Sequence, residues 1–265
     1  MNEQNYDYLA RQLKYTGFGE GLQDKLKEAI LQGKTEFSIF HNQEFGKDNV
    51  VATLQFKKGE DSDMYFFNRY QLMLKGPKQE DPLKQTFYIN SKEDNVTLKE
   101  AYNLVSGRAV EKELTNKEGE KYQAWLQLDF KTIDKHGNFE TKKFHQNYGF
   151  DLPAVLQQLP LKELADEAGR QRLMESLQRG NRQGVTFELH GKEQKVFIEA
   201  APQFKSLNFY DANMKRVQAQ TLYDTNGKEQ TENKSLNQKQ QRSAGSDDDE
   251  GPSVTKGKRK AQRIS

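Results

Sequence analysis

Two segments of the sequence combine aromatic, amide and cationic side chains, which are the materials of base-stacking surfaces on β-sheets. One is residues 65–70, YFFNRY, and the other is residues 204–210, FKSLNFY. In an extended strand Tyr65 and Phe67 point to one face and Phe66 to the other, so we expect at least one face to be core. The segments therefore fit either core packing, the commoner use of such residues, or contact with single-stranded nucleic acid or another planar ligand.

Cationic residues beside these segments, and a basic run at residues 256–263, would add attraction for phosphates. A basic arm binds nucleic acid by releasing counterions, so its affinity is expected to fall steeply with salt. A protein partner is the alternative use of the same surfaces. The candidate nucleic-acid-binding residues are Tyr65, Phe67, Arg69, Phe209, Tyr210, Lys215, Arg216, Lys256, Lys258, Arg259, Lys260 and Arg263.

Motifs of other chemistries are incomplete in this sequence. The glycine-rich stretch at residues 17–21 lacks the preceding strand and the Lys-Ser/Thr of a phosphate loop, and it is interpreted as a flexible connection. Residues 224–227 resemble only a fragment of a calcium loop. The four histidines do not form a metal-ligand spacing; they are His41, His136, His145 and His190. We expect no catalytic, cofactor-binding or metal residues, although an enzyme of unrecognised class, with a site between helix-plus-strand units, stays open.

Three glycines mark the ends of the elements that must position these side chains. Gly33, Gly107 and Gly180 each follow an amphipathic pattern and fit a helix C-cap, and they are separated by 74 and 73 positions. The expected helices span residues 22–32, 97–106 and 161–179, and an N-terminal helix spans 6–14.

Strand-like sequence follows each of these glycines. The expected strands are 36–40, 50–56 and 63–73, then 109–114, 122–130 and 138–144, then 184–190, 195–200 and 206–214. Turn signals such as Asn116 with Gly119 and Asp134 with Gly137 join them as hairpins. The sequence therefore predicts an α+β fold of antiparallel sheets built from short hairpins with packed helices, as three helix-plus-three-strand repeats or as unrelated units.

Composition divides the chain into a neutral body and a basic tail. Residues 225–265 carry 9 Lys and Arg against 6 Asp and Glu, which leaves 32 against 33 in residues 1–224. The tail is poor in apolar residues and is expected to be disordered. The predicted divisions are 1–21 (N-terminal helix and connection), 22–96, 97–160 and 161–224 (three units), and 225–265 (tail).

The absence of cysteine excludes disulfides and thiolate chemistry. No apolar run reaches membrane-spanning length and the N-terminus lacks the layout of a signal peptide, so we expect a cytoplasmic protein without a membrane partner.

Several stretches together resemble a known but uncharacterised family. They include YTGFGE from Tyr15, DMYFFN from Asp63, TLKEAYNL from Thr97, GNRQGVTF from Gly180 and NFYDANMKR from Asn208. The family, a domain of unknown function, is found in Bacteroidetes, often on conjugative or other mobile elements. The resemblance covers nearly the whole body and implies a cytoplasmic accessory protein of a mobile element, close to DNA or to DNA-processing proteins, without naming an activity. We expect this accessory role to be non-enzymatic.

Overall fold

The computed structural model describes residues 1–76, 81–91, 94–189 and 191–223. The chain divides into two units, residues 1–219 and residues 220–265. Only residues 220–223 of the second unit are described, and they belong to a short helix. The predicted disordered tail, residues 225–265, lies outside the described residues.

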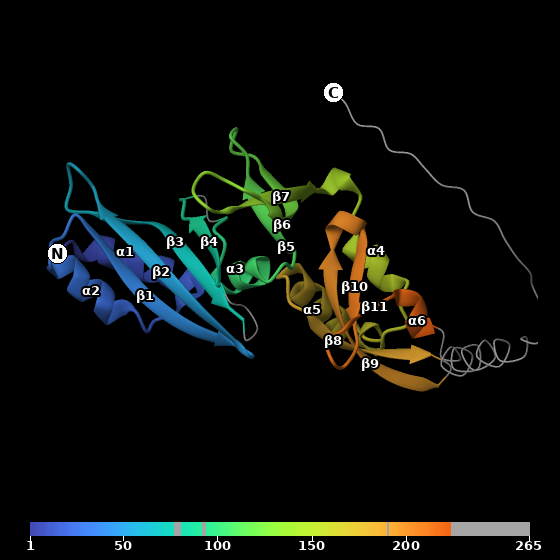
Figure 1. The fold of residues 1–265 in the computed structure, drawn as a ribbon. Helices are drawn as coiled ribbons and strands as arrows, with labels where there is room; N and C mark the ends of the chain where they lie inside the picture. The colour runs from blue at the N-terminus through green and yellow to red at the C-terminus, as the bar shows by residue number, and fades with distance from the viewer. Residues whose placement is uncertain (77–80, 92–93, 190, 224–265) are drawn as a thin grey trace, which may run out of the picture. The chain divides into compact units, whose positions relative to one another are not determined.

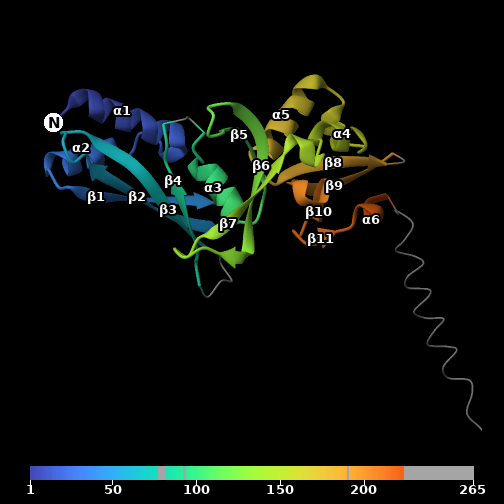
Figure 2. The ribbon, with the colours of Figure 1, turned by 90° about the horizontal axis from the view of Figure 1, so that it is seen from above.

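The first part of the chain forms a four-stranded antiparallel sheet with helices on one face (Figures 1 and 2). The sheet is a meander in the order β1-β2-β3-β4, so each strand pairs with its neighbour in sequence. Its elements are α1 (Glu3–Leu13), a π-helical turn η1 (Lys14–Phe18), α2 (Gln23–Leu31), β1 (Glu36–Phe45), β2 (Asp48–Lys58), β3 (Tyr65–Lys75) and β4 (Leu83–Tyr88).

A hydrophobic core lies between this sheet and its helices. Figure 2 shows α1 and α2 on the same side of the sheet. Phe18 contacts the rings of Phe67 and Tyr70 edge-on, at centroid distances of 6.2 and 5.1 Å. Asn5 of α1 accepts a hydrogen bond from the Tyr65 amide at 2.8 Å and donates one to the Tyr65 carbonyl at 2.9 Å. These contacts fix which face of β3 is internal.

A second, three-stranded antiparallel sheet follows, in the order β5-β6-β7. The helix before it begins with a capping box, in which Thr97 and Glu100 satisfy each other's backbone amides. The elements are α3 (Leu98–Val105), β5 (Val110–Thr115), β6 (Lys121–Ile133), β7 (Phe139–His145), η2 (Gln146–Tyr148), α4 (Leu152–Gln157), η3 (Lys162–Leu164) and α5 (Glu167–Gln178).

The third sheet is antiparallel with the order β11-β10-β9-β8. One of its faces is apolar and buried, with Val185, Phe187, Ile198 and Phe209 in the core. The elements are β8 (Gln183–Leu189), β9 (Lys192–Ala201), η4 (Pro202–Phe204), β10 (Ser206–Tyr210), β11 (Arg216–Val217) and α6 (Ala219–Tyr223).

The structure confirms the predicted α+β class and the three antiparallel sheets, each preceded by a helix. The second sheet has the predicted three strands, whereas the first and third have four, because β4 extends the first sheet and the short β11 extends the third. The predicted strand 206–214 ends at Tyr210. The glycines Gly33, Gly107 and Gly180 follow the helices with φ of 69°, 85° and 79°.

The predicted helix 161–179 begins later than expected, at Glu167. Asp166 is its N-cap and accepts a hydrogen bond from the Gly169 amide at 2.8 Å. The preceding segment is used instead beside β8, where Leu161 forms a bridge with Phe187 and the Glu163 carboxylate accepts from the Thr186 amide. Tertiary contacts with β8 therefore replace the first turns of the expected helix.

The end of α5 is bonded to the end of α3. The Asn103 side chain is fully buried and donates to the Arg179 carbonyl at 2.6 Å and to Asn181 Oδ1 at 3.1 Å. A Cβ on Gly180 would lie 2.7 Å from the Ala109 carbonyl oxygen. Only glycine fits this close approach without a shift of the backbone.

Among the described helices, none is long and apolar enough to cross a membrane.

Candidate functional site

Three of the aromatic residues predicted to stack with bases are part of the core. The exposed fractions are 2% for Tyr65, 3% for Phe67 and 7% for Phe209. Phe67 stacks on Phe56 with a centroid distance of 4.9 Å, and the Tyr65 hydroxyl donates to the Lys34 carbonyl. Their ring faces are thus not open to a ligand in the folded chain, and the assignment of these three residues to a stacking surface is corrected to core packing.

A β-bulge in β3 separates Arg69 from the internal face that Tyr65 and Phe67 share. Gln55 of β2 pairs with Arg69, whereas the next residue, Phe56, pairs with Phe67, so Asn68 is an extra residue in β3. A bulge residue interrupts the alternation of side chains between the two faces. Arg69 therefore points to the opposite face from Phe67, although strict alternation predicts that they share one.

Tyr210 belongs to a polar cluster on the third sheet. The buried carboxylate of Glu199 accepts hydrogen bonds from the Tyr210 hydroxyl and from Asn208, and its other oxygen lies 3.0 Å from Arg182 Nη2. The Arg182 guanidinium lies 3.9 Å from the centroid of the Tyr210 ring. Burial, and then the hydrogen bond to Glu199, raise the pKa of Tyr210 to about 12.

The two predicted cations beside this cluster are exposed. Arg216 is opposite Tyr210 in the β10–β11 pair and donates to Asn208 Oδ1 at 2.6 Å. The Lys215 amide donates to Asp211 in the β10–β11 turn. Because Glu199 is neutralised by Arg182 and its oxygens are bonded, the cluster has the character of a structural network. The remaining predicted cations, Lys256, Lys258, Arg259, Lys260 and Arg263, lie outside the described residues.

A different set of aromatic residues is exposed on the first sheet. We call this surface the open face; it consists of the side chains of β1–β4 that point away from α1 and α2. Three aromatic rings lie on it, with exposed fractions of 64% for Phe40, 46% for Phe66 and 60% for Tyr88. They come from β1, β3 and β4. Three exposed aromatic side chains on one face make it a candidate interaction surface.

The strand register shows how these rings are arranged. Ser38, Gln55, Arg69 and Tyr88 are consecutive partners across all four strands and form one row. In the middle of this row Arg69 Nε donates to Gln55 Oε1 at 2.6 Å. Rows on either side of it contain the other two rings, one containing Phe40, which pairs with Thr53, and the other Phe66, which pairs with Lys57.

The charge of the open face is moderately positive. The register places four cationic side chains on it, on β2, β3 and β4, and two carboxylates, both on β1. No ion pair within 4.0 Å joins any of these six residues to another in the described part of the chain. The cations are Lys57, Arg69, Lys75 and Lys84, and the carboxylates are Glu36 and Glu44.

The sequence alone indicates only some of the residues that form the open face. Phe66 and Arg69 lie in the segment that was singled out, but Phe40 and Tyr88 are far from it along the chain. Alternation in residues 36–40, with Phe37 and Ile39 internal, could have placed Phe40 outside. Tyr88 is brought into the row of Arg69 only by the pairing of β3 with β4.

Two of the histidines, His41 and His145, and the glycine-rich stretch have structural environments, whereas His190 lies outside the described residues. Burial and the nearby Lys25 lower the pKa of His41, whose ring packs edge-on against Phe18. His145 stacks on Tyr122. Gly17 lies in the π-helical turn η1, not in an extended phosphate loop. Among the described residues no group of three or more His, Asp and Glu side chains could hold a metal ion.

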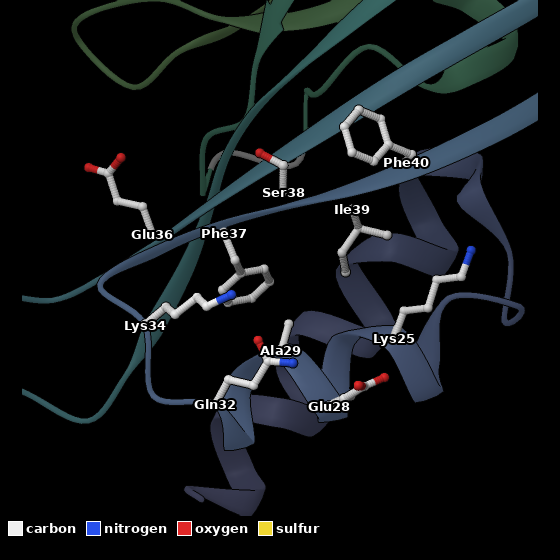
Figure 3. A pocket seen from close by; sticks show the side chains of 10 residues that line it. All are labelled: Lys25, Glu28, Ala29, Gln32, Lys34, Glu36, Phe37, Ser38, Ile39 and Phe40. Carbon is white, nitrogen blue, oxygen red and sulfur yellow. The ribbon is translucent and has the colours of Figure 1, made fainter.

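A hollow of about 440 Å³ lies between α2 and β1 (Figure 3). Residues 36–40 of β1 form one wall, and Lys25, Glu28, Ala29 and Gln32 of α2 form the other. Figure 3 shows Phe37 and Ile39 pointing toward α2 and Phe40 pointing away from it. The hollow thus lies at the outer edge of the first sheet.

Comparison of the chain with protein families, with curated proteins and with solved structures finds no match.

Proposed function

We propose that this chain is a non-enzymatic interaction module that binds single-stranded nucleic acid on the open face of its first sheet. The observation that carries the proposal is the set of exposed rings, Phe40, Phe66 and Tyr88, around the Arg69–Gln55 pair on a face that α1 and α2 leave open. This proposal keeps the stacking hypothesis from the sequence and moves it to the other face of β3.

The physical basis is stacking combined with weak electrostatic attraction. A base stacked on an aromatic side chain contributes roughly 1–3 kcal/mol, and every base offers a ring face, so such binding tolerates many sequences. A guanidinium such as that of Arg69 stacks on bases as well and can contact phosphate. A duplex hides its base faces, so the open face is expected to prefer single strands.

The cellular setting is proposed from the resemblance alone. A module that captures single strands would suit a cytoplasmic accessory protein of a mobile element, because transfer and integration of such elements expose single-stranded DNA. The basic run at residues 256–263 would add salt-sensitive attraction to any nucleic acid, without selecting single strands.

Binding of labelled oligonucleotides to two forms of the full chain separates these contributions. One form is the natural sequence, and the other has Lys256, Lys258, Arg259, Lys260 and Arg263 changed to Gln. We expect the second form to bind more weakly but to keep a preference for single strands over duplex, since the open face is intact. A tail with five fewer cations should also reduce the dependence of affinity on salt. Loss of all binding in the second form would show that only the tail binds, and would contradict the proposal.

A further inference from the structure

The outer edge of β1 carries backbone groups that no described strand pairs with. β1 is the first strand of its sheet and is bonded only to β2. The Thr35 carbonyl accepts from the Lys58 amide at 2.8 Å, which places odd-numbered residues of β1 in the bonded positions of the antiparallel pair. The amides and carbonyls of alternate residues therefore point outward; these residues are Glu36, Ser38, Phe40, Asn42 and Glu44.

Two other sheet edges, those of β4 and β8, are covered by segments of the chain itself. On β4, the Thr86 amide donates to Asn138 Oδ1 at 2.9 Å. On β8, the Thr186 amide donates to the Glu163 carboxylate and the Glu188 amide to the Pro160 carbonyl. Proteins usually protect exposed edges in this way, because an open edge can pair with another strand. On β1 the only such bond among the described residues is local: Gln43 Nε2 donates to the outward Glu44 carbonyl at 3.2 Å, and the outward groups of the other four residues have no cover from another segment.

β1 also lacks several of the features that keep open edges from pairing. Its ten residues pair with β2 without a bulge, and they include no proline and no lysine. The strand is thus long, regular and accessible along its outer side. Such a strand is suited to the addition of a further strand, in which main-chain hydrogen bonds hold the added peptide.

The hollow beside β1 provides a place for side chains of an added strand (Figure 3). Its volume of about 440 Å³ is bounded by the β1 backbone and by α2, and its apolar surface includes Ala29, Phe37 and Ile39. A strand laid along β1 would direct every second side chain toward α2, as β1 itself directs Phe37 and Ile39. One of these side chains would enter the hollow.

Although the open face as a whole is positive, both of its carboxylates lie on β1, so the charge next to the free edge favours basic side chains on an added strand. The side chains of Glu36 and Glu44 lie on the open face near the two ends of β1, and β1 contains no Lys or Arg. Opposite charges on adjacent strands attract each other, so Lys or Arg on an added strand would pair with these carboxylates. From the free edge, the hollow and this charge pattern we infer that β1 binds an extended peptide that alternates apolar residues with basic or polar ones.

A second copy of this chain fits the edge less well than a free peptide does. In a second copy the residues of β1 that would face the hollow are already used in its own core: Phe37 stacks on Phe56 at 4.9 Å, and Ile39 is buried. A symmetric pairing would also place Glu36 and Glu44 of the two copies on the same face, with no cation from β1 to offset them. A peptide without its own core can supply both the apolar and the basic side chains.

The experiment is a selection of random linear peptides of about ten residues, the length of a long strand, on the full chain. Selected peptides are then measured against Ser38→Pro and Ser38→Ala variants. Proline removes the outward amide at position 38, and edge positions tolerate it because that amide is not needed for pairing with β2. We expect alternating apolar and basic peptides whose affinity falls at least about tenfold in Ser38→Pro and is kept in Ser38→Ala.

Hydrogen exchange on the natural chain gives a second measurement that does not depend on folding of the variant. Bound peptide should slow exchange at the amides of Ser38, Phe40 and Asn42 more than at those of Ile39 and His41, which are already bonded to β2. Selection of no peptide, equal affinity for Ser38→Pro, or protection elsewhere would overturn the inference. A dimer of the natural chain that Ser38→Pro dissociates would replace the peptide with a second copy and would overturn it as well.

Discussion

At the scale of single residues, neighbours in the sequence can lie on opposite faces of a sheet, one exposed and the other in the core. Phe66 and Phe67 are adjacent, yet Phe66 is exposed on the open face while Phe67 packs under α1 and α2 with Phe18 and Phe56. The Asn68 bulge places Arg69 on the same face as Phe66. One extra residue in β3 therefore decides which side chains are available to a ligand.

Tyr210 gives a prediction at this scale, because its hydroxyl is held by Glu199. Its pKa of about 12 lies above the ordinary value of 10.0, owing first to burial and then to the hydrogen bond to Glu199. The unfolded chain therefore loses this proton first as the pH rises, and the free energy of unfolding should fall from about pH 10 toward pH 12. Below pH 10 the contribution of protonated Tyr210 to the free energy of unfolding is fully present.

Urea denaturation of the natural chain and of Tyr210→Phe, at about pH 9 and about pH 11, measures the effect. The natural chain should lose more stability between the two values than the variant does. Burial also raises the pKa of Tyr70 and Tyr102, but these residues are present in both chains, so the difference isolates Tyr210. Equal losses in the two chains would contradict the raised pKa of Tyr210.

At the scale of elements, local sequence signals predicted whether a segment is a helix or a strand better than they predicted where it begins and ends. The capping box at Thr97 and the glycines after α2, α3 and α5 marked real helix ends. The third helix was predicted to begin too early, because residues 161–165 have a helical pattern but bond to β8 instead. The short α4 and strand β4 were missed, since their stability comes from packing and pairing with distant residues.

Two of the helix-ending glycines provide a matched test. Gly33 and Gly180 both have positive φ, of 69° and 79°, but a Cβ on Gly33 would meet nothing within 4 Å, whereas on Gly180 it would lie 2.7 Å from both the Ala109 carbonyl oxygen and Val110 Cγ2. Gly33→Ala should cost about 1–2 kcal/mol of unfolding free energy, from backbone strain alone. Gly180→Ala adds a clash with backbone and should cost roughly 3 kcal/mol or more.

Urea denaturation of the two variants is the measurement. The control is built into the pair, because both changes add the same methyl group after a helix. Equal costs would show that the approach of α5 to β5 is looser than the contact at Gly180 implies.

At the scale of the whole molecule, the class of fold followed from the sequence and the site did not. Composition, turn signals and alternation were enough to predict an α+β protein with three antiparallel sheets. The open face depends on the pairing of β1, β2, β3 and β4, which brings Tyr88 into the row of Arg69 and places Phe40 and Phe66 in the rows on either side of it. Alternation separates two faces of a strand, but only tertiary packing decides which face the helices cover.

The central claim, that bases stack on the open face, is tested most directly by the affinity of Phe66→Ala for a single-stranded oligonucleotide. The matched control is Phe204→Ala, because Phe204 is also exposed, at 64%, but lies in η4 on another part of the chain. Loss of one stacking ring should weaken binding by about 5- to 150-fold, equivalent to roughly 1–3 kcal/mol, while the control keeps its affinity. Unchanged affinity in Phe66→Ala, or an equal loss in both variants, would contradict the account.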